Sequence, residues 1–439
     1  MRRDPRADGP PVALTSTGLT ARERAAVAAV DPARIAGELA ELVRIPSVTG
    51  SEEQVQDMVA AILERAGIAV ERVSPSPADT EADRDWPGAE MPRTSLPIVI
   101  GRLGRAGGRR VVLVGHVDVV PPGDPDSWSV DPFGAEVRDG ALYGRGACDM
   151  KGGVEGILEA TRVVGEAIRD ATVDGELIVA FVPSEEDGGQ GMLAAIRAGV
   201  TGEAALITEP TGLEVVVAHA GAITFRLTVP GRAAHASVRR EGVSALDKLY
   251  VLLDALVANE RERNESETNP LMTALGLPYP TIVGKVSGGD WASTVLDRVV
   301  AEGRYGVRLG QSWRDAEAEL RACIDAAVAA DPFLRDHRPG VEIVGGRFSS
   351  SSVPEDHPLP IGLVAAAEAV LGRRPRTMGE PYGADMRLLV NEGSTPTVIF
   401  GPGDIRVAHS ADENVSLDEV ADCARVVAVW ALRELGASA

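Results

Sequence analysis

The sequence predicts an α/β protein in which a mostly parallel β-sheet domain is interrupted by an inserted βαββαβ domain. Strand-like apolar runs alternate with helical segments over roughly two hundred residues, which is typical of a parallel sheet covered on both faces. The periodicity changes between residues 222 and 348, and 439 residues exceed what one hydrophobic core usually serves. We therefore expect a loose N-terminal tail over residues 1–30, the sheet domain over residues 31–216 and 353–439, and the inserted domain over residues 217–352.

The elements of the sheet domain follow from local patterns. Asp31 and Pro32 start an amphipathic helix that runs to Val43, and a second helix begins at residues 51–53 and runs to Gly67. Residues 74–96 are polar and rich in proline, which indicates a surface loop. Short apolar runs predict buried strands, and a longer amphipathic run predicts a helix over residues 152–168. The strands are expected at residues 98–100, 111–114, 177–182, 204–208 and 397–400.

The inserted domain has a different pattern. Apolar and polar residues alternate over four segments, which predicts strands at residues 222–229, 281–287, 298–309 and 341–348. Helical periodicity covers residues 242–259 and 313–330. The resulting order, βαββαβ, implies a ferredoxin-like antiparallel sheet with two helices on one face.

Composition excludes several classes of partner. The 44 Lys and Arg against 65 Asp and Glu give a net charge of -21, which repels nucleic acid. Cys148, Cys323 and Cys423 are too few and too scattered for a disulfide framework, and no apolar run approaches the thickness of a bilayer. Charged residues at 22–24 interrupt the apolar stretch that a signal peptide needs. We therefore expect a cytoplasmic protein with neither a nucleic-acid nor a membrane partner.

Polar side chains that suit metal ions follow several of the predicted strands. His116 and Asp118 come at the end of the strand at 111–114, and Glu209 follows the strand at 204–208. A glycine-rich turn presents Asp149 just before the helix at 152–168, and His409 lies beyond the strand at 397–400. Ligand sites of α/β proteins lie beyond the carboxyl ends of the strands. A histidine beside a carboxylate is also a common metal-binding arrangement.

Glu185 and Glu186 follow the strand at 177–182. Adjacent residues of an extended chain point to opposite sides, so one carboxylate would bind metal and the other would face a reacting water. Alone, such a pair would be a solvated helix start. Its position after an apolar strand and before two glycines at 188–189 favours a site.

Together these motifs resemble the dinuclear zinc amidohydrolases of the M20 type, the family of aminoacylase-1, carboxypeptidase G2, acetylornithine deacetylase and succinyl-diaminopimelate desuccinylase. The matching motifs span nearly the whole chain in the family's order. They are GHVD at 115–118, Trp128 with DPF at 131–133, GRG through DMKGG at 144–153, Glu185 with Glu186, EPT at 209–211, and His409 with Asp412 and Glu413.

The resemblance implies two Zn²⁺ per subunit, with Co²⁺ or Mn²⁺ as possible substitutes. Asp118 would orient His116, and Glu185 would be the general base toward a water shared by two ions roughly 3.5–4 Å apart. The implied ligands are His116 and Glu209 for one ion, Glu186 and His409 for the other, and Asp149 as the bridge.

The resemblance also implies that the inserted domain is a lid and the interface of a homodimer. His235, within GRAAHAS at 231–237, matches the family's histidine that stabilises the oxyanion, although a histidine in a turn can be purely structural. Where the family usually has an asparagine, this chain has Ser293, which leaves the substrate's identity open. Arg304 and Arg308 face the same side of a strand, where either could pair with a substrate carboxylate or simply face solvent.

We expect a metal-dependent hydrolase that cleaves the amide bond of a small N-acyl amino acid or related N-acyl amine. The segments YGADMR at 382–387 and FGPGD at 400–404 are similar to acetylornithine deacetylase and favour deacylation. A dipeptidase or carboxypeptidase, or an N-formyl-aminopyrimidine deformylase, on the same site is the alternative. A non-catalytic binding protein is disfavoured, because a binder needs no general base and Glu185 is present.

Overall fold

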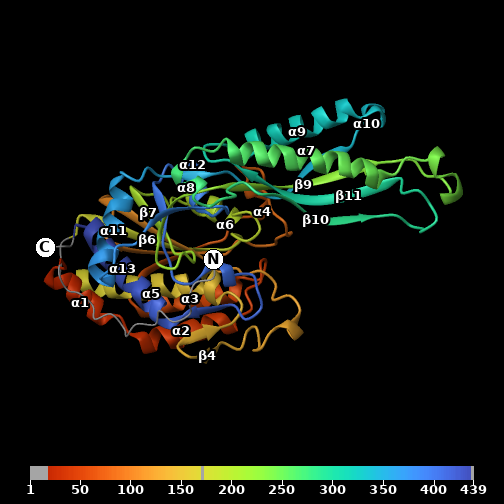
Figure 1. The fold of residues 1–439 in the computed structure, drawn as a ribbon. Coiled ribbons are helices and arrows are strands. Elements are labelled where there is room, and N and C mark those ends of the chain that lie inside the picture. The colour runs from red at the N-terminus through yellow and green to blue at the C-terminus, as the bar shows by residue number, and fades with distance from the viewer. Residues whose placement is uncertain (1–17, 170–172, 437–439) are drawn as a thin grey trace.

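The computed structural model describes residues 18–169 and 173–436, and these form three β-sheets. The largest sheet has nine strands and lies at the centre of the main body (Figure 1). Its central strands β6, β3, β7 and β15 are parallel, whereas β2 joins β6 and β8 joins β15 in the antiparallel sense. The predicted α/β class, with a largely parallel central sheet, is confirmed. In sheet order the strands are β1 (Ala69–Val73), β2 (Ile98–Gly104), β6 (Gly175–Val182), β3 (Arg109–His116), β7 (Ala204–Ile207), β15 (Thr397–Ile399), β8 (Val215–His219) and β13 (Ser351–Ser352), with β14 (Thr377–Glu380) beside β8.

Helices cover both faces of this sheet. Almost every residue of β3, β6 and β7 is therefore buried. One layer lies below the sheet in Figure 1 and consists of α2 (Pro32–Arg44), α3 (Glu53–Arg65), α5 (Gly152–Ile168) and α13 (Leu417–Glu434). Above it lies α12 (Met386–Asn391), and α6 (Gln190–Arg197) contacts both α12 and β6. Helix α2 begins as predicted, with Asp31 accepting a hydrogen bond from the N–H of Ala33 (2.9 Å). The remaining helices of this part are α1 (Ala21–Ala29), α4 (Pro77–Glu81) and α11 (Pro358–Leu371).

The second sheet has four strands and projects from the main body, with α7 (Ala245–Glu265) and α9 (Trp313–Ala330) on one face (Figure 1). Its strands are all antiparallel and lie in the order β10-β11-β9-β12. The chain order βαββαβ therefore matches the prediction, and short helices α8 (Pro270–Thr273) and α10 (Pro332–Asp336) are additions to it. The strands are β9 (Gly221–Pro230), β10 (Thr281–Gly288), β11 (Arg298–Val307) and β12 (Gly340–Phe348).

The boundaries and the tail differ from the expectation. Residues 217–219 and 351–352 belong to β8 and β13 of the large sheet, so the inserted sheet spans Gly221 to Phe348. The loose tail predicted over residues 1–30 is wrong for residues 18–30. There Thr20 and Glu23 form a capping box for α1, and Arg433 of α13 pairs with Glu23 (2.8 Å). Residues 1–17 lie outside the described residues.

The segment at 74–96 lies largely at the surface, as expected, but Trp86 and Gly88 also contact the inserted sheet. The guanidinium carbon of Arg347 lies 5.0 Å from the ring centre of Trp86 and 4.8 Å from that of Trp313. Gly88 has a φ of +81°, and a Cβ there would lie 2.2 Å from the carbonyl oxygen of Gly345. Glycine thus permits this close approach, which the polar composition of the segment conceals.

A third sheet of three short strands flanks the glycine-rich turn, in the order β16 (Asn414–Ser416), β5 (Ala141–Tyr143) and β4 (Glu136–Arg138). Within the described ranges, no helix combines the length and the apolar character needed to cross a membrane.

Candidate metal centre

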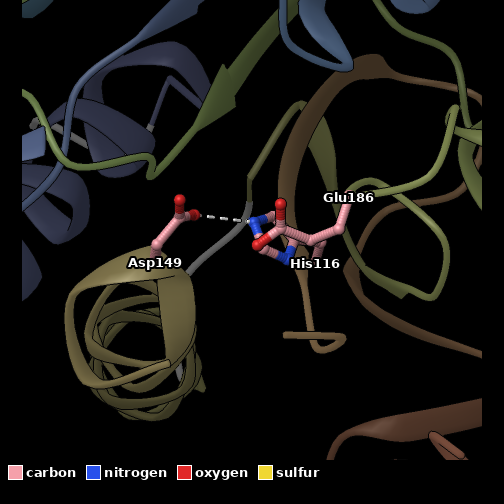
Figure 2. Close-up of side chains that lie close together, drawn as sticks. All are labelled: His116, Asp149 and Glu186. Atoms are coloured by element: carbon pink, nitrogen blue, oxygen red, sulfur yellow. Dashed lines mark hydrogen bonds and ion pairs between the residues drawn. The ribbon is translucent and has the colours of Figure 1, made fainter. Parts of the chain in front are cut away.

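The predicted ligands meet at the carboxyl edge of the parallel strands. His116 is the last residue of β3, Glu185 and Glu186 follow β6, and Glu209 follows β7. Since these three strands are parallel neighbours, their ends bring the side chains to one place. Figure 2 shows Asp149, at the start of the α5 region, pointing toward His116 and Glu186.

Asp149 stands between the two histidines. Its Oδ1 lies 3.0 Å from His116 Nε2, and its Oδ2 lies 3.3 Å from His409 Nε2. Glu209 Oε1 is 3.6 Å from His116 Nε2, and Glu186 is 3.1 Å from His409 Nε2. Each carboxylate oxygen of Asp149 thus faces one histidine, and each histidine has one glutamate beside it. This arrangement is the one that a bridging ligand requires.

The carboxylates are buried together and repel one another. Burial, followed by repulsion from Asp149, raises the pKa of Glu186 to about 7. Burial also raises the pKa of Glu209 to about 7, against the attraction of His116. Burial and then the charges of Asp385 and Glu209 raise the pKa of Glu185 well above its ordinary value. For Asp149, burial opposes ionisation, but hydrogen bonds with His116 and His409 outweigh it and lower the pKa.

This donor set fits divalent metal ions. Two sets of ligand atoms, from His116 with Asp149 and Glu186 and from His116 with Glu185 and Glu209, each lie within 4.8 Å of one another. Buried carboxylates in excess of the histidines need a compensating cation. Imidazole and carboxylate donors without thiolate suit Zn²⁺ and also accept Co²⁺ or Mn²⁺.

Asp118 contacts His116, which it was predicted to orient, and also the segment of Glu185 and Glu186. The Nδ1 of His116 lies 2.9 Å from the backbone carbonyl of Asp118 and 3.6 Å from its carboxylate. The fully buried carboxylate instead accepts hydrogen bonds from the N–H groups of Glu185 (3.1 Å) and Glu186 (3.2 Å). Its backbone therefore orients the histidine, and its side chain holds the two glutamates.

Glu413 holds the turn that carries Asp149. Its buried carboxylate accepts hydrogen bonds from the N–H groups of Cys148 (2.9 Å) and Asp149 (3.0 Å) and pairs with Arg145 (2.5 Å). Behind the turn, a Cβ at Gly153 would lie 2.0 Å from the carbonyl oxygen of Thr208, so glycine lets α5 approach the strand that presents Glu209. The sequence motif contained Glu413 but did not reveal this function.

Replacing Glu413 with glutamine is expected to weaken metal affinity by about 10–100-fold, because partners that position metal ligands contribute that much. It should also destabilise the fold by about 3–5 kcal/mol, since Arg145 would remain buried without a counter-charge. Metal titration and thermal unfolding measure the two effects. Glu136→Gln, which removes only an exposed pair with Arg138, is the control and should change neither.

On the other side of the site, buried charges that the sequence did not single out support the loop at 184–189. Arg93 pairs with Glu52 (2.9 Å) and lies 3.5 Å from Asp187, and its side chain is 1 % exposed. Arg387 donates to the carbonyl of Gly188 (2.6 Å) and lies 3.7 Å from Asp385. An arginine within a proline-rich segment gives no local signal of such burial.

A cavity of about 250 Å³ opens onto the site. Asp149, Glu185, Glu186, Glu209 and His409 line one part of it, and Tyr382, Gly383, Ala384, Ile405 and Ala408 line the rest. The hydroxyl of Tyr382 is buried and has no hydrogen-bond partner among the described residues. Burial, followed by the charges of Glu380 and Glu209, raises the pKa of Tyr382 well above its ordinary value, so the phenol keeps its proton.

The residues predicted on the inserted domain are not gathered at the cavity. His235 and Ser293 are exposed, and His235 Nδ1 lies 2.8 Å from Ser237 Oγ. Arg308 lies 3.4 Å from Glu319 of α9, which gives it a structural partner. Arg304 donates to the carbonyl of Pro381 (2.9 Å), beside the cavity, and makes no ion pair with any described residue. The two arginines therefore differ in their partners, because Arg308 faces a carboxylate and Arg304 faces a backbone carbonyl.

Comparisons with known proteins agree with this geometry. Residues 112–433 match the model of peptidase family M20/M25/M40. Succinyl-diaminopimelate desuccinylase of Methylorubrum extorquens is 30% identical over 404 residues, covering 89% of this chain and 95% of that protein. N-formyl-4-amino-5-aminomethyl-2-methylpyrimidine deformylase of Bacillus subtilis is 25% identical, covering 85% of this chain and 88% of that protein.

Among solved structures, an M20 family metallo-carboxypeptidase of Sulfolobus solfataricus superposes with a TM-score of 0.71 at 15% identity, covering 90% of this chain and 98% of that one. At 15% identity, this structural similarity shows a shared fold and nothing further. The family model matches most of the chain, and a relative aligned over nearly its full length is 30% identical. These two matches indicate common descent. The chain is therefore a member of peptidase family M20/M25/M40, whose enzymes hydrolyse amide bonds.

Proposed function

We propose that this enzyme hydrolyses the amide bond of a small N-acyl amino acid or a related N-acyl amine. The observation that carries the proposal is the cavity of about 250 Å³, in which Glu185 lies beside the histidine and carboxylate cluster. A space of that size suits a small acyl group. The desuccinylase and deformylase relatives are named for removing such groups, which supports the same substrate class.

We infer that the cluster holds two metal ions, with Zn²⁺ as the first candidate and Co²⁺ or Mn²⁺ as substitutes. His116 and Glu209 would bind one ion, Glu186 and His409 the other, and Asp149 both, because its two oxygens face the two histidines. When bound, such a pair of ions lowers the pKa of a water and polarises the substrate carbonyl.

In this proposal Glu185 is the general base. Its carboxylate lines the cavity and takes a proton from the attacking water, and it then delivers that proton to the leaving nitrogen. Asp118 fixes the directions of Glu185 and Glu186 by accepting hydrogen bonds from both of their N–H groups. One carboxylate therefore remains available for proton transfer while its neighbour binds metal.

Arg304 is the residue that we assign to a substrate carboxylate. It is half-buried, burial lowers its pKa, and it makes no ion pair with a described carboxylate. A guanidinium in that state favours a bidentate carboxylate ligand. Ser293, which is exposed, would contact substrate only after the inserted domain closes over the cavity.

A second candidate is N-formyl-aminopyrimidine deformylation, which the Bacillus subtilis relative favours. A dipeptidase or carboxypeptidase activity would use the same cavity and the same base. The three activities differ in the acyl group and in whether the leaving amine carries a carboxylate. Arg304 would contribute to binding only for substrates whose leaving amine carries a carboxylate.

The test is a panel of N-acetyl, N-succinyl and N-formyl compounds together with dipeptides, assayed with added Zn²⁺ or Co²⁺. Hydrolysis of an N-acyl compound that has a free carboxylate, with a raised KM in Arg304→Ala, is the expected result. Preferred cleavage of dipeptides would assign the peptidase alternative. A metal-loaded protein that hydrolyses nothing in the panel would contradict the proposal.

We further propose a cytoplasmic homodimer formed through the inserted domain. Strand β10 lies at the edge of its sheet, with Ile282 and Val286 exposed. Helix α7 of the same domain exposes Tyr250 and Val257. An unpaired strand edge with apolar residues favours pairing with a second copy. The three cysteines are free, which suits a reducing compartment.

His235→Ala is expected to lower kcat by about 10²–10³-fold, if its imidazole donates to the oxyanion of the partner subunit's site, while metal binding is retained. The exposed position of His235 motivates the arrangement across two subunits. Mixing inactive Glu185→Ala with inactive His235→Ala should restore activity, because heterodimers then contain one intact site. Unchanged kcat in His235→Ala would show that this histidine is structural.

A further inference from the structure

We propose that the hydroxyl of Tyr382 donates a hydrogen bond to the oxygen of the substrate's acyl carbonyl as that oxygen gains negative charge. The donor belongs to the same chain as the metal centre. The proposal rests on the proposed amide hydrolysis and names a catalytic residue beyond the base and the metal ligands.

The hydroxyl of Tyr382 has an unusual environment. Tyr382 lines the cavity together with Glu185, Glu209 and Asp149, and its Oη is buried without any hydrogen-bond partner among the described residues. An unpaired buried hydroxyl destabilises a folded protein and calls for an explanation. The explanation that we propose is that the hydroxyl gains its partner, an oxygen of the substrate, only when substrate fills the cavity.

Among the side chains that line the cavity, the hydroxyl of Tyr382 is a neutral donor near several carboxylates. The carboxylates of Asp149, Glu185 and Glu209 accept hydrogen bonds when ionised and would repel an oxyanion. The phenol of Tyr382 lies near these carboxylates and is a neutral donor, because it keeps its proton. Within this chain it lines the same cavity as the base, whereas His235 is exposed on the inserted domain.

The backbone around Tyr382 is held on both sides. Arg304 of the inserted sheet donates to the carbonyl of Pro381 (2.9 Å), and Arg387 donates to the carbonyl of Ala384 (2.9 Å). Arg387 is itself fully buried. A donor on a segment fixed in this way is already oriented before the reaction, which is what makes such hydrogen bonds effective in catalysis.

The test compares Tyr382→Phe with Tyr305→Phe, a matched control that removes a buried hydroxyl that has a partner. Tyr305 donates to Asn259 Oδ1 (2.7 Å), on the inserted domain. Tyr382→Phe is expected to lower kcat on the best substrate of the panel by about 10²–10³-fold, with little change in KM. Its Tm should not fall, since no existing hydrogen bond is lost. Tyr305→Phe should lower Tm and leave kcat unchanged.

A second measurement uses methylphosphonate, a tetrahedral anion, and acetate, a planar one, as probes of the metal-loaded proteins. The Tyr382→Phe variant should bind methylphosphonate more weakly than the wild type by a factor similar to its loss of kcat, with acetate affected less. Retained kcat or retained methylphosphonate affinity would overturn the proposal. A wild-type protein inactive on the whole panel would contradict the proposed function instead, and the methylphosphonate titration would still test Tyr382.

Discussion

Glu185→Ala is expected to lower kcat by several orders of magnitude while both metal ions stay bound. General-base assistance contributes roughly 10²–10⁴-fold, and a badly placed attacking water should add to the loss. Metal should be retained because Asp149, Glu186 and Glu209 each lie beside one or both histidines without the help of Glu185. Single-turnover kinetics with elemental analysis of the same sample measures both effects.

The control for this variant is Glu355→Ala, which removes an exposed carboxylate away from the cavity and should leave kcat unchanged. Near-normal turnover in metal-loaded Glu185→Ala would place the base elsewhere in the cavity. Loss of metal from that variant would instead mean that Glu185 is a ligand.

Asp149→Ala is expected to abolish turnover and to weaken the binding of both metal ions. Residues that only position a ligand contribute roughly 10–100-fold to metal affinity, so the loss of a bridging ligand should exceed that factor. One carboxylate contacts both histidines, so its removal affects both halves of the cluster. Isothermal titration with Zn²⁺ should show the loss, and the exposed Asp126→Ala should bind metal like the wild type.

The wild type provides the complementary experiment. A chelator should abolish its activity, and Zn²⁺ or Co²⁺ should restore it. Active protein in which elemental analysis finds no transition metal would contradict the assignment of this cluster as a metal centre.

Much of the candidate site could be predicted from the sequence, because His116, Glu186 and Glu209 each come shortly after an apolar run. The runs at 111–114 and 204–208 predict strands, which the structure has as β3 and β7, and parallel neighbours place their carboxyl ends together. His116 and Glu209 therefore meet even though they are far apart in the chain. The inserted domain could be predicted for a similar reason, since the alternation of period two in β9 and β11 follows directly from one buried face.

Other features depended on contacts that no local pattern reports. The proline-rich segment that contains Arg93 has the composition of an exposed loop, yet Arg93 is buried beside Glu52 and Asp187. Arg304 and Arg308 have the same spacing on the sequence, but Arg308 lies beside Glu319 of α9 whereas Arg304 donates to the carbonyl of Pro381.

The sequence by itself determined the fold class and the order of the inserted strands, because both depend on the spacing of residue types along each segment. The candidate metal ligands came from the resemblance of several separate motifs to a known family. Tertiary structure alone decided that the carboxylate of Asp118 holds Glu185 and Glu186, that Glu413 holds Asp149, and that the hydroxyl of Tyr382 is buried without a partner. A hydrogen bond forms between atoms within about 3 Å of one another, and chain segments remote in sequence reach that distance only after the sheets and helices have packed.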